Sequence, residues 1–382
     1  MNQNFPTHLL EEAPAKRIEY FKDFSVAHPF FVAAFKEIFI RITNPSTKQI
    51  FLVYGPSGVG KSELFKKVYE KFLKEYKDQM ETDHCIIPIA GFEAIAPDNG
   101  KYDWKEHYIR SLMALNEPLI EHKIDIYKTI NKQLSNKERQ PNRELRRSLE
   151  NALKFRKTKA VLIDEAQHIT FNGSSKTAID QMNLIKSLVS KSDTPHVMFG
   201  TYEILDFRDS LGQLSRRGLD IHFRRYDIRK KDEQEMFIKT LWNLQKHIPL
   251  SSEPNLVEHW KYFYQVSVGC IGILKDLIAT TLEYNLQENP NLTTLTLDHF
   301  KEYALTTNQT YKLAKEAIEG ENNVEINNRK NDDVAMLLGM PGIEDKIADA
   351  ESKENKGKRV DKKTSQVGVG VRKPKRDAVG DT

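Results

Sequence analysis

The sequence predicts an α/β domain with a parallel sheet covered by helices on both faces, followed by an all-helical domain and a disordered tail. Short apolar runs alternate with helical patterns up to residue 228. From Arg229 onward only helical periodicity remains, and no aromatic residue follows Tyr311. These observations divide the chain into an N-terminal segment (1–23), the α/β domain (24–228), the helical domain (229–319) and a basic tail (320–382).

Five short runs predict the strands of the sheet. Most are continuously apolar, as expected for parallel strands buried on both faces. The last run carries arginines, which predicts a position near an edge of the sheet. The runs are Ile50–Tyr54, Cys85–Ile89, Ala160–Asp164, His196–Gly200 and Asp220–Tyr226.

Apolar residues at helical spacing fill the intervals between these runs and the whole helical domain. The predicted helices are His28–Thr43, Glu63–Tyr76, parts of Tyr102–Lys157, Thr177–Lys191, Lys231–Lys246, Leu256–Val268, Ile271–Asn285 and Leu297–Ile318. Within the tail, residues 333–350 have weak apolar spacing. This segment is either a linker or a stretch that folds on a partner.

Composition places the chain among soluble proteins with a real core, since 29% of the residues are charged and 39% are hydrophobic. No apolar run approaches the roughly 20 residues that span a bilayer, and the start does not resemble a signal peptide. Cys85 and Cys270 lie in apolar runs and are predicted to be buried thiols rather than a disulfide. We therefore expect a cytoplasmic protein without membrane partners.

Charge is concentrated at one end of the chain. Glu351–Thr382 holds ten Lys/Arg and five Asp/Glu, a net +5, whereas the whole chain has a net charge of +4. The rest is therefore close to neutral, and any nucleic-acid contact of the folded part needs a local basic patch.

The segment GPSGVGKS, between the first predicted strand and a helix, fits the phosphate-binding pattern G-x-x-x-x-G-K-[ST]. Glycines let consecutive N–H groups point inward around an anion, and the helix N-terminus adds a positive end. Lys61 would contact the outer phosphates of ATP, and the Ser62 hydroxyl would bind Mg²⁺. The predicted nucleotide contacts are Gly55, Pro56, Ser57, Gly58, Val59, Gly60, Lys61, Ser62 and Glu63.

An acidic pair ends the third predicted strand, in AVLIDEAQHI. Asp164 would hold Mg²⁺ through water, and Glu165 would be the base that activates the attacking water. The alternative is an acidic solvated loop after a strand. The upstream phosphate-binding loop favours the catalytic interpretation.

This combination of a phosphate-binding loop, a strand-end Asp-Glu pair and a following helical domain resembles the AAA+ class of ATPases. The resemblance implies that Thr201, after the fourth strand, touches the γ-phosphate; the alternative is a helix N-cap. It also implies that an arginine before the fifth strand, Arg217 or Arg216, acts on the nucleotide of a neighbouring subunit. The alternative for these arginines is a surface pair.

A narrower resemblance, to the TnsC/TniB group of transposition regulators and more distantly to MuB and IstB, covers about residues 24–318. It rests on LIDEAQHI, NLIKSLVS, HVMFGTYEILDF and QLSRR in this order, and on VGCIGILKDLI in the helical domain. In this group a basic residue often follows the second glycine of the last motif. Here that position is Ile273, and Lys275 is the candidate substitute.

The TnsC/TniB resemblance implies a bacterial ATPase that assembles on duplex DNA as a ring or helical filament when ATP is bound. Such proteins connect a target-selection protein, in some systems CRISPR-associated, to the transposase, and hydrolysis drives disassembly. The protein would contact duplex DNA through the phosphates of its backbone. The candidate residues are Lys101, Lys105, Arg143, Arg147 and Lys154, for which a solvated helix face is the alternative.

Two other functions remain open from the sequence. One is a different AAA+ DNA machine, such as an initiator-like protein or a helicase loader, which would share the same catalytic residues. The other is a signalling NTPase that uses the nucleotide to switch a protein interface without binding DNA.

Overall fold

The computed structural model describes residues 4–44, 49–97, 100–123, 141–169, 175–205 and 218–338. The chain divides after Glu321 into two units, and the described part of the second, up to Leu338, is helical to Leu337. All domains discussed below belong to the first unit.

Five parallel strands form one sheet in the order β2-β3-β4-β1-β5. The strands are β1 (Ile50–Tyr54), β2 (Ile89–Glu93), β3 (Ala160–Asp164), β4 (His196–Gly200) and β5 (Gly218–His222). All five residues of both β1 and β4 are buried, which explains their continuous apolar sequence. The predicted α/β architecture and the edge position of β5 are confirmed. β1, β3 and β4 also have the predicted bounds.

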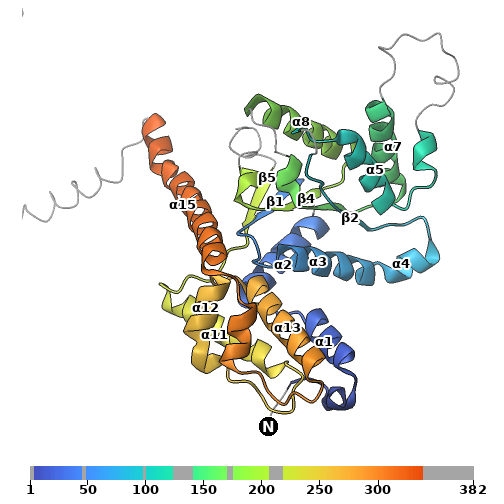
Figure 1. Ribbon diagram of the computed structural model, residues 1–382. Helices are drawn as coiled ribbons and strands as arrows, with labels where there is room; N and C mark the ends of the chain where they lie inside the picture. The colour runs from blue at the N-terminus through green and yellow to red at the C-terminus, as the bar shows by residue number, and fades with distance from the viewer. Residues whose placement is uncertain are drawn as a thin grey trace, which may run out of the picture. The chain divides into compact units, whose positions relative to one another are not determined.

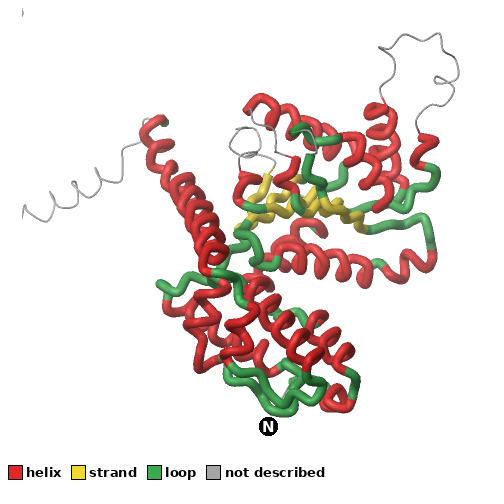
Figure 2. The backbone as a smooth tube through the Cα atoms, viewed as in Figure 1, coloured by secondary structure: helices red, strands yellow, loops and turns green. Residues whose placement is uncertain are grey.

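Helices cover both faces of this sheet (Figures 1 and 2). One face carries α2 (Pro29–Thr43) and α3 (Lys61–Glu75), which pack against Phe51, Leu162 and Phe199. The other carries α5 (Trp104–Ala114), α7 (Pro141–Phe155) and α8 (Ser175–Ser192). A short α4 (Lys77–Thr82) and the 3₁₀ helices η2 (Ile120–Lys123), η3 (Ala166–Ile169) and η4 (Tyr202–Ile204) complete this domain.

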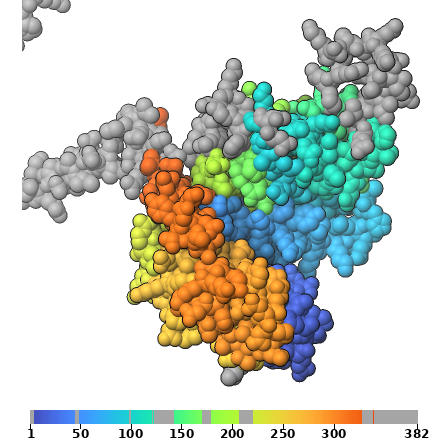
Figure 3. Space-filling view, in the orientation of Figure 1, coloured from blue at the N-terminus to red at the C-terminus, as the bar shows by residue number. Residues whose placement is uncertain are grey.

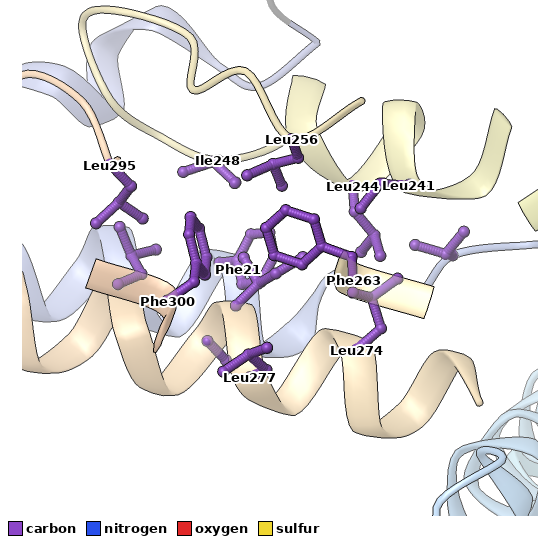
Figure 4. Close-up of a cluster of buried hydrophobic side chains, with 14 of the residues drawn as sticks. Phe21, Leu241, Leu244, Ile248, Leu256, Phe263, Leu274, Leu277, Leu295 and Phe300 are labelled. Carbon is purple, nitrogen blue, oxygen red and sulfur yellow. The ribbon is translucent and has the colours of Figure 1, made fainter. Parts of the chain in front are cut away.

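The helical domain packs around a separate apolar core. Its helices are α11 (Lys231–Lys246), α12 (Trp260–Ser267), α13 (Ile271–Glu288) and α14 (Leu297–Tyr303), with η5 (Val257–His259) before α12. The long helix α15 (Thr307–Leu337) follows, and the boundary between the two units falls within it. Figure 4 shows Leu244, Phe263, Leu274 and Phe300 converging in this core.

The N-terminal segment is part of the helical domain, although it lies more than 200 residues away in sequence. It contains η1 (Thr7–Glu11) and α1 (Pro14–Asp23), and α1 packs along α13. Figure 3 shows these dark-blue residues beside the orange helical domain. Phe21 of α1 is fully buried among the residues of Figure 4. The predicted division of the chain treated residues 1–23 as a separate segment. In the structure this segment contributes to the core of the helical domain, which was predicted to consist of residues 229–319 alone.

The second strand begins later than predicted, at Ile89 instead of Cys85. Pro88 has no N–H for a strand ladder, and the regular strand starts directly after it. Cys85 lies in the preceding turn, where its N–H donates to Asp83 at 3.0 Å, and it is exposed. The prediction of a buried Cys85 is wrong, whereas Cys270 is buried and both thiols are free.

The end of the fifth strand and the last predicted helix also differ from expectation. β5 ends at His222, and the Tyr226 N–H donates to Gly269 O in the helical domain instead of to a strand. The predicted helix Leu297–Ile318 is broken into α14 and α15. The Thr306 hydroxyl accepts from the Gln309 N–H at the start of α15.

α15 also corrects the predicted tail. Residues 320–337 were expected to be disordered, but they continue the helix that starts at Thr307. The rest of the tail, and most of the segment 333–350, lies outside the described residues.

No single helix within the described ranges is long and apolar enough to cross a membrane. Only the pair formed by Val257–Ser267 and Ile271–Glu288 reaches that length and composition, and this pair is bent by 112°.

Candidate active site

The loop between β1 and α3 forms a concave backbone surface. Gly58 and Gly60 have φ values of 73° and 110°, a conformation that side chains other than glycine rarely adopt. The Lys61 ammonium folds back onto this loop and donates to the carbonyl oxygens of Gly55 at 3.0 Å and Pro56 at 2.9 Å. Burial lowers the pKa of Lys61, and the nearby carboxylates of Glu165 and Asp164 oppose that shift.

The acidic pair at the end of β3 lies beside this loop. Because the strands are parallel, the carboxyl ends of β1, β3 and β4 share one edge of the sheet. Burial raises the pKa of the Asp164 carboxyl, and the nearby Ser62 hydroxyl opposes that shift. Ser62 and Asp164, the two predicted Mg²⁺ ligands, thus lie near each other.

Glu165 occupies a left-handed backbone conformation, with φ of 49°. Its N–H donates to the Asp164 carboxylate at 2.9 Å, which stabilises this unusual turn. A non-glycine residue in this region stores strain of order 1–3 kcal/mol, a feature that is frequent at active sites.

Thr201 follows β4 and lies on the same cleft. It occupies the N-cap position of η4, but its side chain makes no capping hydrogen bond. The Thr201 hydroxyl is buried and has no partner within the described part of the chain. The capping alternative is therefore wrong, and the hydroxyl is available to a ligand.

Most of these groups line a cleft of about 420 Å³, whereas Asp164, Gly55 and Pro56 are not among its lining residues. Its walls include Ser57, the residues from Gly58 to Glu63, Glu165, Thr201 and Lys275, all of which the sequence had singled out. Gln167 also lines the cleft. It donates to the Glu165 carboxylate and accepts from the Thr201 N–H at 3.2 Å.

Sequence reasoning missed the opposite wall of the cleft. Ser25, Val26, His28 and Phe31, from the segment before α2 and its first turn, lie there with Ile271. Burial lowers the pKa of His28 to about 4, and its Nδ1 is 3.0 Å from the Tyr226 hydroxyl. This wall therefore presents apolar and uncharged groups, as a planar heterocyclic base requires. For this part of the chain the sequence had predicted only a helix over His28–Thr43.

The helical domain contacts the phosphate-binding loop through the start of α13. The Ile273 N–H donates to Gly58 O at 3.0 Å, and a Cβ on Gly272 would lie 2.4 Å from that oxygen. Lys275 reaches the cleft, but its ammonium donates to Lys22 O at 2.7 Å, and burial lowers its pKa. Lys275 is thus close to the loop and already hydrogen-bonded to the chain start.

The first half of α15 also reaches the site, which the sequence did not predict. The Ser57 hydroxyl donates to Glu316 at 2.9 Å. Five residues later, Glu321 pairs with Arg225 at 2.9 Å, and the Arg225 side chain is 8% exposed. α15 therefore contacts both the phosphate-binding loop and the connection between β5 and α11.

The predicted arginines and DNA contacts have separate outcomes. Arg216 and Arg217 lie outside the described residues. The five DNA candidates are all exposed: Lys101, Lys105, Arg143, Arg147 and Lys154. Four of them lie on α5 and α7, which pack together.

The donor set fits a magnesium-bound nucleoside triphosphate. The loop has positive φ at Gly58 and Gly60, a backbone conformation that lets consecutive N–H groups surround an anion. Ser62 and Asp164 are oxygen ligands of the kind that Mg²⁺ prefers. The unpartnered Thr201 hydroxyl lines the same cleft and could donate a hydrogen bond to such a ligand.

Residues 42–207 match the family model of the AAA domain. Together with the sheet order and the helical C-terminal portion, this match shows the AAA+ P-loop fold. The sequence matches no curated protein significantly.

Several solved structures are similar to this chain at low identity. A Walker-type ATPase of Pyrococcus abyssi is 15% identical over 78% of this chain and 75% of that chain, with a TM-score of 0.44. The ADP form of the Aeropyrum pernix ORC2 protein is 11% identical over 75% and 71%, with a TM-score of 0.47. Domain III of the Thermotoga maritima replication initiation protein DnaA is 15% identical over 74% and 94%, with a TM-score of 0.40.

Proposed function

We propose that this protein is a Mg²⁺-dependent ATPase of the AAA+ class. The observation that carries the proposal is the convergence of Lys61, Glu165 and the unpartnered Thr201 hydroxyl on one cleft beside a phosphate-binding loop. The apolar wall around Val26, with His28 uncharged, suits the base.

Each residue has a chemical task in this proposal. Lys61 exchanges its two backbone carbonyl acceptors for phosphate oxygens. This exchange is favourable, because an ammonium binds a charged phosphate oxygen more strongly than a neutral carbonyl oxygen. Ser62 and Asp164 hold Mg²⁺, which neutralises phosphate charge. Glu165 accepts the proton of the attacking water, a contribution of about 10²–10⁴ in rate. Thr201 donates to the reacting phosphate.

We further propose that ATP hydrolysis serves the control of DNA transposition, in a bacterial cytoplasm. The support is the ordered set of TnsC/TniB-like segments, from LIDEAQHI to QLSRR. In this proposal copies of the chain assemble on duplex DNA as a ring or helical filament. They connect a target-selection protein to a transposase, and Arg217 of one subunit completes the site of the next.

The first test is assembly on DNA. Electron microscopy of the wild type with long duplex DNA and a non-hydrolysable ATP analogue should show rings or filaments. Glu165→Gln should bind ATP, lose at least about 100-fold in turnover and stay on DNA, because only the base is removed. Lys61→Ala should bind neither nucleotide nor DNA. Rapid ATP turnover by Glu165→Gln would remove Glu165 from its assigned role.

The second test concerns the DNA-facing residues. The paired charge reversals Lys101→Glu/Lys105→Glu and Arg143→Glu/Arg147→Glu should weaken cosedimentation with duplex DNA. Lys77→Glu is the control, because Lys77 is an exposed basic residue on α4 with 70% side-chain exposure. If neither paired variant changes cosedimentation with DNA, and DNA does not stimulate the ATPase activity, the signalling NTPase is favoured. Binding restricted to an origin or a helicase would favour an initiator or loader.

A further inference from the structure

Gln167 connects the two groups that face the reacting phosphate. It lies in η3, directly after the acidic pair, and is 6% exposed. Its amide N–H donates to the Glu165 carboxylate, and its carbonyl oxygen accepts from the Thr201 N–H at 3.2 Å. One side chain thus joins the ends of strands β3 and β4.

The neighbouring backbone is shaped to hold this amide. A Cβ on Gly200, the last residue of β4, would lie 2.8 Å from the Gln167 amide oxygen. Glycine at this position leaves the space that the amide occupies. Because both ends of the amide are bonded and its sides are packed, the orientation of the Glu165 carboxylate depends on Gln167.

We propose that Gln167 is a positioning residue for ATP hydrolysis: it fixes the Glu165 carboxylate for proton abstraction and ties it to the Thr201 backbone. This inference rests on the proposed ATPase function and deepens it. One carboxylate oxygen is engaged by the amide N–H, which leaves the other oxygen to receive the proton of water.

The assignment predicts a kinetic signature that differs from a loss of stability. Gln167→Met keeps the length of the side chain and removes both hydrogen bonds. Loss of a hydrogen bond to a charged group should lower kcat about tenfold or more. KM and the affinity for a fluorescent ATP analogue should stay within about twofold, because the phosphate-binding loop is untouched.

The chain offers a matched control in Gln245. Its amide has the same pattern of partners, because it donates to Glu253 and accepts from the Leu256 N–H at 2.7 Å. Gln245 is 8% exposed and lies in α11, outside the cleft. Gln245→Met therefore measures the effect of losing such a bridge on folding alone, and its kcat should equal that of the wild type.

A double-mutant cycle completes the experiment. In a Glu165→Gln background, Gln167→Met should have no further effect on the residual turnover, because its action passes through Glu165. An unchanged or raised kcat in Gln167→Met would overturn the proposal, and so would a full additional loss in the Glu165→Gln background. If Gln167→Met fails to fold, Gln167→Glu, which keeps the shape and removes the donor, must show the same loss of kcat.

The two proposals can fail separately. A wild-type protein that binds and hydrolyses ATP, with no kinetic effect of Gln167, refutes only the positioning role. A wild type that binds no ATP refutes the ATPase function, and the positioning role with it.

Discussion

Thr201 illustrates how a single side chain can reveal a ligand. A buried hydroxyl without a partner costs about 1–3 kcal/mol, because it gives up its hydrogen bonds to water. The Thr201 hydroxyl is in this position among the described residues, while its own N–H is bonded to Gln167. In the proposed ATP complex, a phosphate oxygen that accepts from the hydroxyl would offset this cost.

This reasoning predicts opposite effects of Thr201→Val on stability and activity. Valine has nearly the same shape, so the nucleotide-free variant should be as stable as the wild type or more stable by about 1 kcal/mol. Its ATPase kcat should fall about tenfold or more, since the phosphate loses a donor. Urea unfolding without nucleotide and steady-state ATPase assays provide the two measurements.

Thr158→Val is the control for this substitution. The Thr158 hydroxyl is also buried, but it donates to Ile87 O at 2.9 Å. Its removal should destabilise the protein by about 1 kcal/mol and leave ATPase unchanged. A Thr201→Val protein as destabilised as Thr158→Val would mean that the Thr201 hydroxyl has a partner in solution.

At the scale of elements, α15 is held to the α/β domain by a buried charge pair. Arg225 lies between β5 and α11, and Glu321 extends from α15 to meet it. Arg225 also donates to the Tyr264 hydroxyl at 3.2 Å. Because its guanidinium is desolvated, the loss of Glu321 would leave a buried charge without its counterion.

Glu321→Ala should therefore lower the free energy of unfolding by about 3 kcal/mol. Hydrogen exchange of residues 307–321 should also become faster, because the anchor of the helix is lost. Glu319→Ala is the control on the same helix: Glu319 pairs with Lys315 at 3.7 Å, and both side chains are at least 60% exposed. Its effect should stay below about 1 kcal/mol, and equal effects of the two variants would contradict a buried anchor.

At the scale of the whole molecule, buried histidines tie stability to pH. His107 and His196 are 2% and 1% exposed, and burial lowers their pKa values to about 3 and about 4. In the unfolded chain a histidine titrates near 6.5. Protons therefore bind the unfolded chain more readily than the folded one below this value.

The stabilisation from neutral His107 and His196 should be complete above pH 6.5 and decline as the pH falls toward 4. Between pH 6.5 and pH 5 each contributes a loss of about 1.6 kcal/mol. Denaturant unfolding at a series of pH values measures this slope. His196→Gln should reduce it, whereas His84→Gln, at an exposed position, should not. A slope identical in all three proteins would exclude His196 as a source.

Local sequence patterns were sufficient to predict the phosphate-binding loop, the acidic pair and the bounds of β1, β3 and β4. These features are local. A phosphate cradle needs consecutive N–H groups, as in Gly55–Ser62, and a doubly buried strand needs a continuous apolar run, as in Ala160–Asp164. The assignment of Arg217 and the choice among DNA machines stay predictions.

The residues that share the cleft come from distant parts of the chain, and their proximity could be seen only in the folded structure. Val26 and His28 face the phosphate-binding loop, Gln167 joins β3 to β4, and Glu316 meets Ser57 across more than 250 residues of sequence. No local sequence pattern predicts these contacts between distant residues, because they arise from the order of the strands and from the burial of α1 in the helical core. The type of each residue determines what it can bind, whereas the packing of the whole chain determines which residues contact it.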